Sequence, residues 1–352
     1  MIPCLTLLEV LASRVGGFRF LFENYEAGAA VYRRTGVALP EEVLQAAEGA
    51  DAILLGAMGL PDVRYPDGTE VSPQIEFRER FSLYAGVRPI RLLPGTPTPL
   101  ADPRARQLDY VLVRESTEGL FTARTLTRRA GDAVFDTMRV SRQACERLFE
   151  FTFNLARARS QRRGRAARVT CVDKANVIPS TAFFRSIFLE FASRYPDVET
   201  DCAYVDATGL RLVRAPWEFD VIVTENMFGD ILSDVGAALI GGMGMAPSAD
   251  IGDKHAVFQP CHGSAPDIAG RGVANPTAMF LSAAMMLDWL GERHNVPACT
   301  RAAADLVRAI EAAYSDGTLV TVENGGRADT VAVTERVHRC LDQTFAASQQ
   351  PV

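Results

Sequence analysis

Two aspartates four residues apart are the group in this sequence that most directly suggests chemistry. Asp230 and Asp234 lie in the segment FDVIVTENMFGDILSD, in which an apolar strand pattern is followed by a helical one over residues 229–240. Residues four apart on a helix share one face, so both carboxylates point the same way. Hard divalent cations such as Mg²⁺ or Mn²⁺ take oxygen ligands of this type. Acidic residues that complement a helix dipole give the same pattern, so the pair alone leaves both readings open.

A third carboxylate and three arginines can likewise be interpreted either as functional residues or as structural ones. Asp206 ends a short strand-like segment, residues 204–206, where an aspartate can also be a helix cap. Arg78 lies on a helical pattern, Arg88 precedes a proline, and Arg114 follows the apolar strand 110–113. Three guanidinium groups could hold a dicarboxylate through bidentate hydrogen bonds, or they could form surface ion pairs.

Lys174 follows the predicted strand 168–172. A lysine near other cations or a metal has a lowered pKa and can serve as a general base, whereas a salt bridge to Asp173 or another neighbour is the plain alternative.

A loop rich in small residues supplies a candidate cofactor site. It reads HGSAPDIAGRGVANPTA from His262 onward. Glycine and other small residues let the backbone approach a ligand, and Asp267 could accept hydrogen bonds from ribose hydroxyls. An acid at this position repels the additional phosphate of NADP and therefore favours NAD. His262 could instead be a structural histidine.

Strands that alternate with helices must position these groups, which predicts an α/β protein. The expected strands are residues 18–22, 51–56, 110–113, 168–172, 204–206 and 221–224, and the expected helices are 5–14, 40–48, 142–159, 179–194, 229–240, 276–290 and 301–315.

The composition and the absence of certain motifs argue against several classes of protein. The chain has 352 residues, 48% of them hydrophobic, and a formal charge of -6, which gives no basic surplus for nucleic acid. The longest apolar stretch, 278–290, is shorter than the ~20 residues of a membrane span. Seven scattered cysteines without C-x-x-C spacing predict reduced thiols in a cytoplasmic protein. No G-x-G-x-x-G, G-x-x-x-x-G-K-[ST] or G-x-S-x-G motif is present, so a standard Rossmann dehydrogenase, a P-loop enzyme and an α/β-hydrolase are disfavoured.

Taken together, these segments resemble the β-decarboxylating dehydrogenase family, which includes isocitrate, 3-isopropylmalate, homoisocitrate and tartrate dehydrogenases. The matching segments follow the family order from residue 51 to 286 and read DAILLGAMG, VRPIRLLPG, VRESTEG, VDKANV, YVDA, FGDILSD, HGSAPDIAG and ANPTA. The resemblance implies a two-domain fold with a large central mixed sheet. Residues 1–83 with 241–352 would form the large cofactor-binding domain, and 84–240 a small domain that carries the dimer interface.

The resemblance also implies a reaction: NAD⁺ oxidises a C3-substituted malate at C2, and the product loses its β-carboxylate. It assigns the substrate carboxylates to Arg78, Arg88 and Arg114, and Mg²⁺ or Mn²⁺ to Asp206, Asp230 and Asp234. Lys174 is then the base, and Lys174 and Asp206 reach into the partner subunit's site of a homodimer. The implied NAD-binding residues are His262, Gly263, Ser264, Ala265, Asp267 and Asn275.

Three departures from the family pattern modify these expectations. Family members usually open with a GDGIGPE loop near the nicotinamide, and this chain begins after it, so we expect either a start further upstream or a cofactor pocket that lacks one edge. Phe121 occupies the position of a tyrosine that assists protonation of the enol, so we expect oxidation to survive better than the final proton transfer. Ser72 and Gln74 replace the paired leucines that recognise an isopropyl group. A buried polar group left unpaired costs ~1 to 3 kcal/mol, which favours a small or polar substituent.

Two other functions remain as alternatives. A catalytically impaired relative that acts as a regulatory subunit or scaffold is suggested by Phe121 and the absent first loop. A metal-free 2-hydroxyacid dehydrogenase is disfavoured by the absence of the glycine fingerprint.

Overall fold

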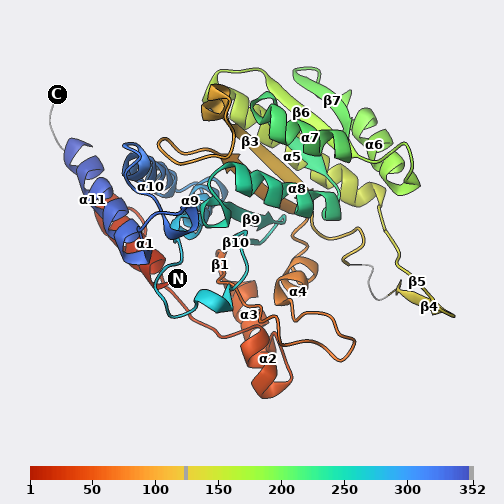
Figure 1. Cartoon of the computed structure of the whole chain (residues 1–352), viewed down its shortest axis with the longest axis horizontal. Coiled ribbons are helices and arrows are strands. Elements are labelled where there is room, and N and C mark those ends of the chain that lie inside the picture. Colours follow the sequence, from red (N-terminus) through yellow and green to blue (C-terminus); the bar gives the residue numbers. More distant parts are fainter. Residues whose placement is uncertain (123–125, 349–352) are drawn as a thin grey trace.

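One continuous mixed sheet organises the molecule. The computed structural model describes residues 1–122 and 126–348. Eight strands lie in the order β1-β10-β9-β2-β3-β8-β6-β7. Figure 1 shows the separate two-stranded hairpin, β4-β5, which projects from the body. The sheet combines antiparallel pairs such as β2–β3 with parallel pairs such as β3–β8. This confirms the predicted α/β fold with a large mixed sheet.

The strands are short and the helices are long. The strands are β1 (Ile53–Leu54), β2 (Ala85–Arg91), β3 (Asp109–Glu115), β4 (Arg128–Ala130), β5 (Ala133–Phe135), β6 (Ala167–Asp173), β7 (Val198–Tyr204), β8 (Val221–Thr224), β9 (Pro247–Ile251) and β10 (Ala256–Pro260). The α-helices are α1 (Ile2–Val15), α2 (Ala29–Thr35), α3 (Glu41–Gly49), α4 (Pro73–Arg80), α5 (Arg142–Arg163), α6 (Pro179–Ala192), α7 (Val205–Arg214), α8 (Asn226–Leu239), α9 (Thr277–Arg293), α10 (Pro297–Tyr314) and α11 (Thr330–Ser348).

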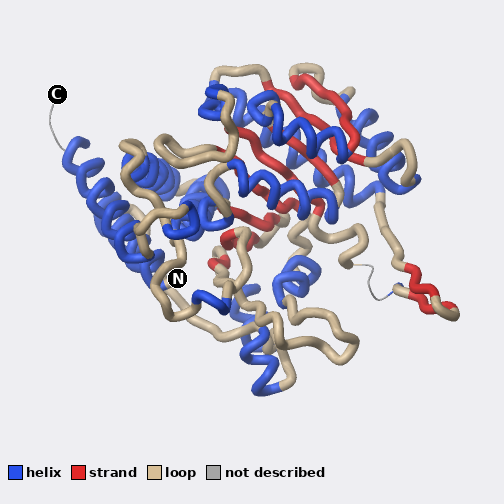
Figure 2. The backbone as a smooth tube through the Cα atoms, in the orientation of Figure 1, coloured by secondary structure: helices blue, strands red, loops and turns tan. Residues whose placement is uncertain are grey.

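Helices cover both faces of the central strands, as the tube in Figure 2 shows. Successive residues of β3, β8 and β6 are almost all buried, which requires cover on both sides of a sheet. Helices α5 and α6 pack on one another and on β6, while α7 and α8 pack on one another and α8 lies against β2 and β3. At the other end of the molecule α9 packs on β9 and β10, and α1, α10 and α11 form an outer layer.

The structure corrects several predicted boundaries. Residues 18–22 are not a strand, because no strand of the described chain pairs with them and their phenylalanines pack on one another instead. Residues 51–56 contain only the two-residue β1. The strand predicted at 204–206 ends at Tyr204, and Asp206 lies in the first turn of α7, where an acid complements the helix dipole.

Other elements were shifted or missed. Helix α8 begins at Asn226, three residues before the predicted start, because Glu225 caps it by accepting hydrogen bonds from the amides of Met227 and Phe228. Strands β2, β4, β5, β9 and β10 and helices α2, α7 and α11 were not predicted. The strand β2 contains a proline and charged residues, so its pattern does not alternate.

The predicted division into two domains stays a prediction, since the sheet runs without a break across the β9–β2 boundary. None of the described helices combines the length and apolar composition needed to cross a membrane.

A close approach between α8 and the β2–β3 pair gives the first test of this fold. A Cβ atom added at Gly236 would lie 2.8 Å from the hydroxyl of Tyr110 and 2.9 Å from Ile90. We expect Gly236→Ala to lower the free energy of unfolding by about 1 to 3 kcal/mol, because overpacking a rigid core forces strained side chains.

Thermal and urea unfolding would measure this loss. Gly49→Ala is the matched control, since the last residue of α3 has no atom within 4 Å of an added Cβ. A Gly236→Ala protein as stable as the Gly49→Ala protein would contradict the described packing of α8.

Candidate active site

The predicted substrate-binding residues line one cavity of about 580 Å³, together with Asp230 and Asp234, two of the three predicted metal ligands. Its walls come from α4, β2, β3, α8, the segment after β1 and the loop after β10. Strands β1 and β10 are parallel, so the segments that follow them leave the sheet at the same edge. The cavity thereby collects residues that lie far apart in the sequence.

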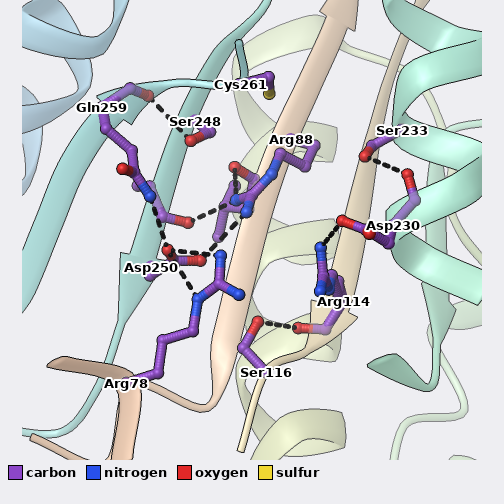
Figure 3. A network of polar contacts seen from close by, with 12 residues as sticks. Arg78, Arg88, Arg114, Ser116, Asp230, Ser233, Ser248, Asp250, Gln259 and Cys261 are labelled. Atoms are coloured by element: carbon purple, nitrogen blue, oxygen red, sulfur yellow. Dashed lines mark hydrogen bonds and ion pairs between the residues drawn. The ribbon is translucent and has the colours of Figure 1, made fainter. Parts of the chain in front are cut away.

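Arg78 and Arg88 share one buried counter-ion, Asp250 on β9 (Figure 3). The Nε of Arg78 donates to Oδ2 of Asp250 at 3.1 Å, and Nη2 of Arg88 donates to Oδ1 at 3.2 Å. Gln259 adds a hydrogen bond of 3.2 Å from its amide to Oδ2. The side chain of Asp250 is 2% exposed, so the four residues form a closed network in the cavity wall.

Asp250 remains ionised in this network. Burial raises the pKa of its carboxyl, but the charges of Arg78, Arg88 and Arg114 outweigh burial and bring the pKa down to about 2. Sequence reasoning missed this residue because it sits in PSADIG, a strand without a motif of its own. The available signal was a lone acid in a run of small and apolar residues, which predicts a buried charge in need of a partner.

Arg114 completes the arginine set from the end of β3. Its Nε donates to Oδ1 of Asn226 at 2.8 Å, its Nη1 pairs with Asp230, and its guanidinium lies 5.4 Å from the centre of the Phe121 ring. Burial and the nearby positive charge of Arg78 lower the pKa of Arg114 to about 10. The position of α8 makes these contacts possible, since an added Cβ at Gly229 would lie 2.7 Å from the Arg114 side chain.

Asp230 and Asp234 both face the cavity, as predicted from their spacing. Burial raises the pKa of Asp234, and the negative charge of Asp230 raises it further. A divalent cation would relieve this repulsion, and the donors are the hard oxygens that Mg²⁺ and Mn²⁺ prefer. The pair therefore fits such an ion, although residues 1–122 and 126–348 of one chain contain no group of three His, Cys, Asp or Glu side chains arranged to hold a metal.

Lys174 and Asp206 do not line this cavity: Lys174 follows the last residue of β6, and Asp206 lies in the first turn of α7. The Nζ of Lys174 is 2.6 Å from Oδ1 of Asp206, while Asp173 pairs with Arg185 instead. Within one chain, Lys174 is therefore in the plain salt bridge that the sequence left open, with Asp206 as its partner. That hydrogen bond lowers the pKa of Asp206, which is exposed.

The predicted cofactor loop forms another wall of the cavity. Residues 262–265 line it, and Ser264 donates a hydrogen bond of 2.5 Å to the carbonyl of Gly59, which joins the loop to the segment after β1. Asp267 and Asn275 do not line the cavity. The amide of Asn275 donates to Glu323 at 2.8 Å, and its oxygen accepts from the amide of Thr277 at the start of α9.

Two unpaired polar side chains face the cavity from α4. Ser72 precedes the first residue of the helix and Gln74 lies in its first turn, and both line the cavity beside Val71 and Ile75. Neither the Ser72 hydroxyl nor the Gln74 amide has a hydrogen-bond partner among the side chains and backbone that the structure describes. Phe121, the departure from the family pattern, also lines the cavity.

Comparison with known proteins identifies the family of the chain. The isocitrate/isopropylmalate dehydrogenase family model matches residues 3–337. A 3-isopropylmalate/3-methylmalate dehydrogenase of Methanocaldococcus jannaschii is 42% identical over 91% of this chain and 90% of its own length. A homoisocitrate dehydrogenase of the same organism is 43% identical over 76% of each chain.

A solved structure is also similar. The crystal structure of isocitrate dehydrogenase from Methylococcus capsulatus aligns with a TM-score of 0.82 at 32% identity, over 97% of this chain and 96% of that one. The chain therefore belongs to the isocitrate/isopropylmalate dehydrogenase family, a family of β-decarboxylating dehydrogenases that act on 3-substituted malates.

Proposed function

We propose that this chain uses NAD⁺ and Mg²⁺ or Mn²⁺ to oxidise and decarboxylate a malate with a small or polar C3 substituent. The observation that supports this most is the meeting of Arg78, Arg88 and Arg114 with Asp230 and Asp234 in one cavity. Oxidative decarboxylation of such an acid needs positive groups that bind the substrate carboxylates. It also needs oxygen ligands that hold a divalent metal next to them.

The proposed reaction consists of an oxidation followed by a decarboxylation. The substrate loses a hydride from C2 to NAD⁺ and its hydroxyl proton to a base, and the resulting ketone has a carboxylate on the adjacent carbon. The bond from C3 to that carboxylate then breaks, CO₂ leaves, and C3 takes a proton. A divalent ion, when bound, stabilises negative charge on the substrate oxygen as a Lewis acid.

The residues of the cavity divide this work. The three arginines bind and orient the substrate carboxylates, and Asp230 and Asp234 supply oxygen ligands to the metal. Residues 262–265 position the nicotinamide cofactor, for which Asp267 and Asn275 remain proposed adenosine contacts. Loss of the ion pair with Asp206 would release Lys174 to act as the base for the hydroxyl proton.

We further propose that two copies of the chain complete each site. Lys174 and Asp206 lie outside the cavity of their own chain, which supports a base and a third metal ligand supplied by Lys174 of the partner subunit and Asp206 of the partner subunit. Helices α7 and α8 offer a surface for this assembly, because Leu210, Val213 and Ile231 are each more than half exposed there. Exposed apolar side chains on adjoining helices are typical of a subunit interface.

The C3 substituent is proposed from the unpaired groups on α4. Ser72 and Gln74 can donate to or accept from a polar substituent, and an isopropyl group would leave both desolvated without partners. We also propose a cytoplasmic location, which is supported by the seven cysteines, none of which forms a disulfide.

A catalytically impaired subunit is the second candidate. It is favoured by Phe121, whose ring stacks on Arg114 and offers no proton at the cavity wall. Robust turnover would exclude it.

The central experiment measures NADH and CO₂ release with malate, tartrate, 3-methylmalate, 3-isopropylmalate and isocitrate in the presence of Mn²⁺. We expect activity with a small or polar substituent and its loss in EDTA. The Asp234→Asn protein should bind Mn²⁺ at least about tenfold more weakly by calorimetry, because it loses a charged oxygen ligand. Activity that persists in EDTA, or no activity with any of these acids, would refute the proposal.

Mixed dimers test the shared site. Lys174→Met and Asp234→Asn proteins should each be inactive, but subunit exchange between equal amounts makes half of the dimers mixed. Each mixed dimer has one intact site and one doubly altered site, so about a quarter of wild-type activity should return. Recovery should follow the formation of mixed dimers, read by native mass spectrometry, and mixed dimers without activity would place Lys174 and Asp234 in the same site of one chain.

Replacement of Phe121 tests the proton-transfer step. Phe121→Tyr keeps the ring against Arg114 and adds a hydroxyl, so we expect CO₂ release to rise about tenfold or more, a modest share of what a positioned general acid provides. Phe121→Leu is the control that removes the ring without adding a donor. Unchanged CO₂ release in Phe121→Tyr would show that the missing hydroxyl does not limit the reaction.

A further inference from the structure

Asp250 is a buried carboxylate that the proposed reaction does not use. It lies behind the guanidinium groups of Arg78 and Arg88, and it does not line the cavity itself. Its strand pairs with β2 on one side and β10 on the other, with Asp250 opposite Gly86 and Val257. A substrate therefore cannot displace Asp250, and its charge is a fixed part of the site.

The two arginines keep hydrogen-bonding capacity despite this partner. Nη1 of Arg88 donates to the carbonyls of Val87 and Ala249, and Nη2 gives one bond to Asp250. Arg78 contacts Asp250 through Nε and Nη2. Since a guanidinium has five N–H groups, each arginine retains at least two for a ligand, while half of their combined charge is already neutralised.

The sum of the charges in the site determines how many carboxylates of a ligand can be neutralised there. Arg78, Arg88 and Arg114 carry three positive charges, and their partners Asp250 and Asp230 carry two negative ones. Asp234 adds a third negative charge when it serves as a ligand of the divalent cation. In the resting dimer that we propose, before Lys174 gives up a proton to act as the base, Lys174 of the partner subunit and Asp206 of the partner subunit carry opposite charges that offset each other. The protein groups are thus neutral together, and the divalent cation of the proposed function matches a substrate with two carboxylates. A third carboxylate would be buried without a counter-charge, which is costly.

We propose that Asp250 is a specificity-determining residue: its fixed charge tunes the arginine cluster to a hydroxy-dicarboxylate with an uncharged C3 substituent and excludes tricarboxylates such as isocitrate. This inference rests on the proposed function, which left the charge of the substituent open. It separates this chain from a relative that acts on homoisocitrate, whose substituent carries a carboxylate.

Malate and isocitrate, which differ by one carboxymethyl group at C3, are the probes. Their dissociation constants are measured by calorimetry with Mn²⁺ and without NAD⁺, so binding is read without turnover. We expect the wild-type protein to bind malate at least about tenfold more tightly than isocitrate, as one uncompensated charge requires. Asp250→Asn keeps the shape but removes the charge, and it should shift this ratio about tenfold toward isocitrate.

A second variant shifts the ratio in the opposite direction. Gln259 contacts Asp250 from the cavity wall, so Gln259→Glu adds a negative charge beside the arginines and should strengthen discrimination against isocitrate. It keeps the test decisive if Asp250→Asn fails to fold. The matched control is Asp253→Asn, which removes an acid three residues along the chain, where Asp253 accepts from the hydroxyl of Tyr84 outside the cavity.

The outcomes separate the two proposals. A malate-to-isocitrate ratio that stays within about twofold of wild type in Asp250→Asn or in Gln259→Glu would overturn the role of Asp250, as would wild-type preference for isocitrate. The expected shifts without NADH production from any acid would support charge selection and refute the proposed reaction. NADH production with unchanged malate-to-isocitrate ratios would support the proposed reaction and refute the role of Asp250.

Discussion

The arrangement of this molecule depends on three guanidinium groups held together inside the protein. Like charges in a poorly solvated place need counter-ions, and Asp250 supplies one to Arg78 and Arg88 while Asp230 supplies one to Arg114. The sheet register makes this possible, because Gly86 lies between Asp250 on β9 and Arg114 on β3. A side chain at position 86 would begin 3.2 Å from the Asp250 carboxylate and 2.6 Å from the Ser116 hydroxyl. The glycine therefore keeps space at the centre of the charged network.

Local patterns in the sequence predicted much of the fold and many of the site residues. The strand at 221–224 and the helical spacing of Asp230 and Asp234 follow from hydrophobic period alone. Partnerships between distant strands could not be read in this way. Asp250 meets Arg88 from 162 residues away, and no local pattern encodes that contact. The failure at residues 18–22 has the same origin, because alternation predicts a strand only where a neighbouring strand is available to pair with it.

The site residues separate into those that one chain brings together and those that it does not. Arginines at the ends of α4 and β3 and within β2 converge with α8, so the resemblance and the geometry agree on them. Lys174 and Asp206 pair with each other, whereas the sequence offered a salt bridge of Lys174 to Asp173 or another neighbour as the alternative to a base. Phe121 is both a departure from the family pattern and a structural part of the wall, since its ring stacks on Arg114. A phenylalanine ring therefore packs on the arginine without a hydroxyl group.

The contact between Lys174 and Asp206 has a consequence for the protein before it is assembled. In a single subunit the amine and the carboxylate satisfy one another, and the described part of the chain brings neither Lys174 nor a third acidic metal ligand next to its arginines. In the dimer that we propose, specific activity would therefore fall on dilution as dimers dissociate. A newly synthesised chain would be inactive until it binds a second copy. The concentration of the protein in the cell would therefore determine the fraction of chains that are active.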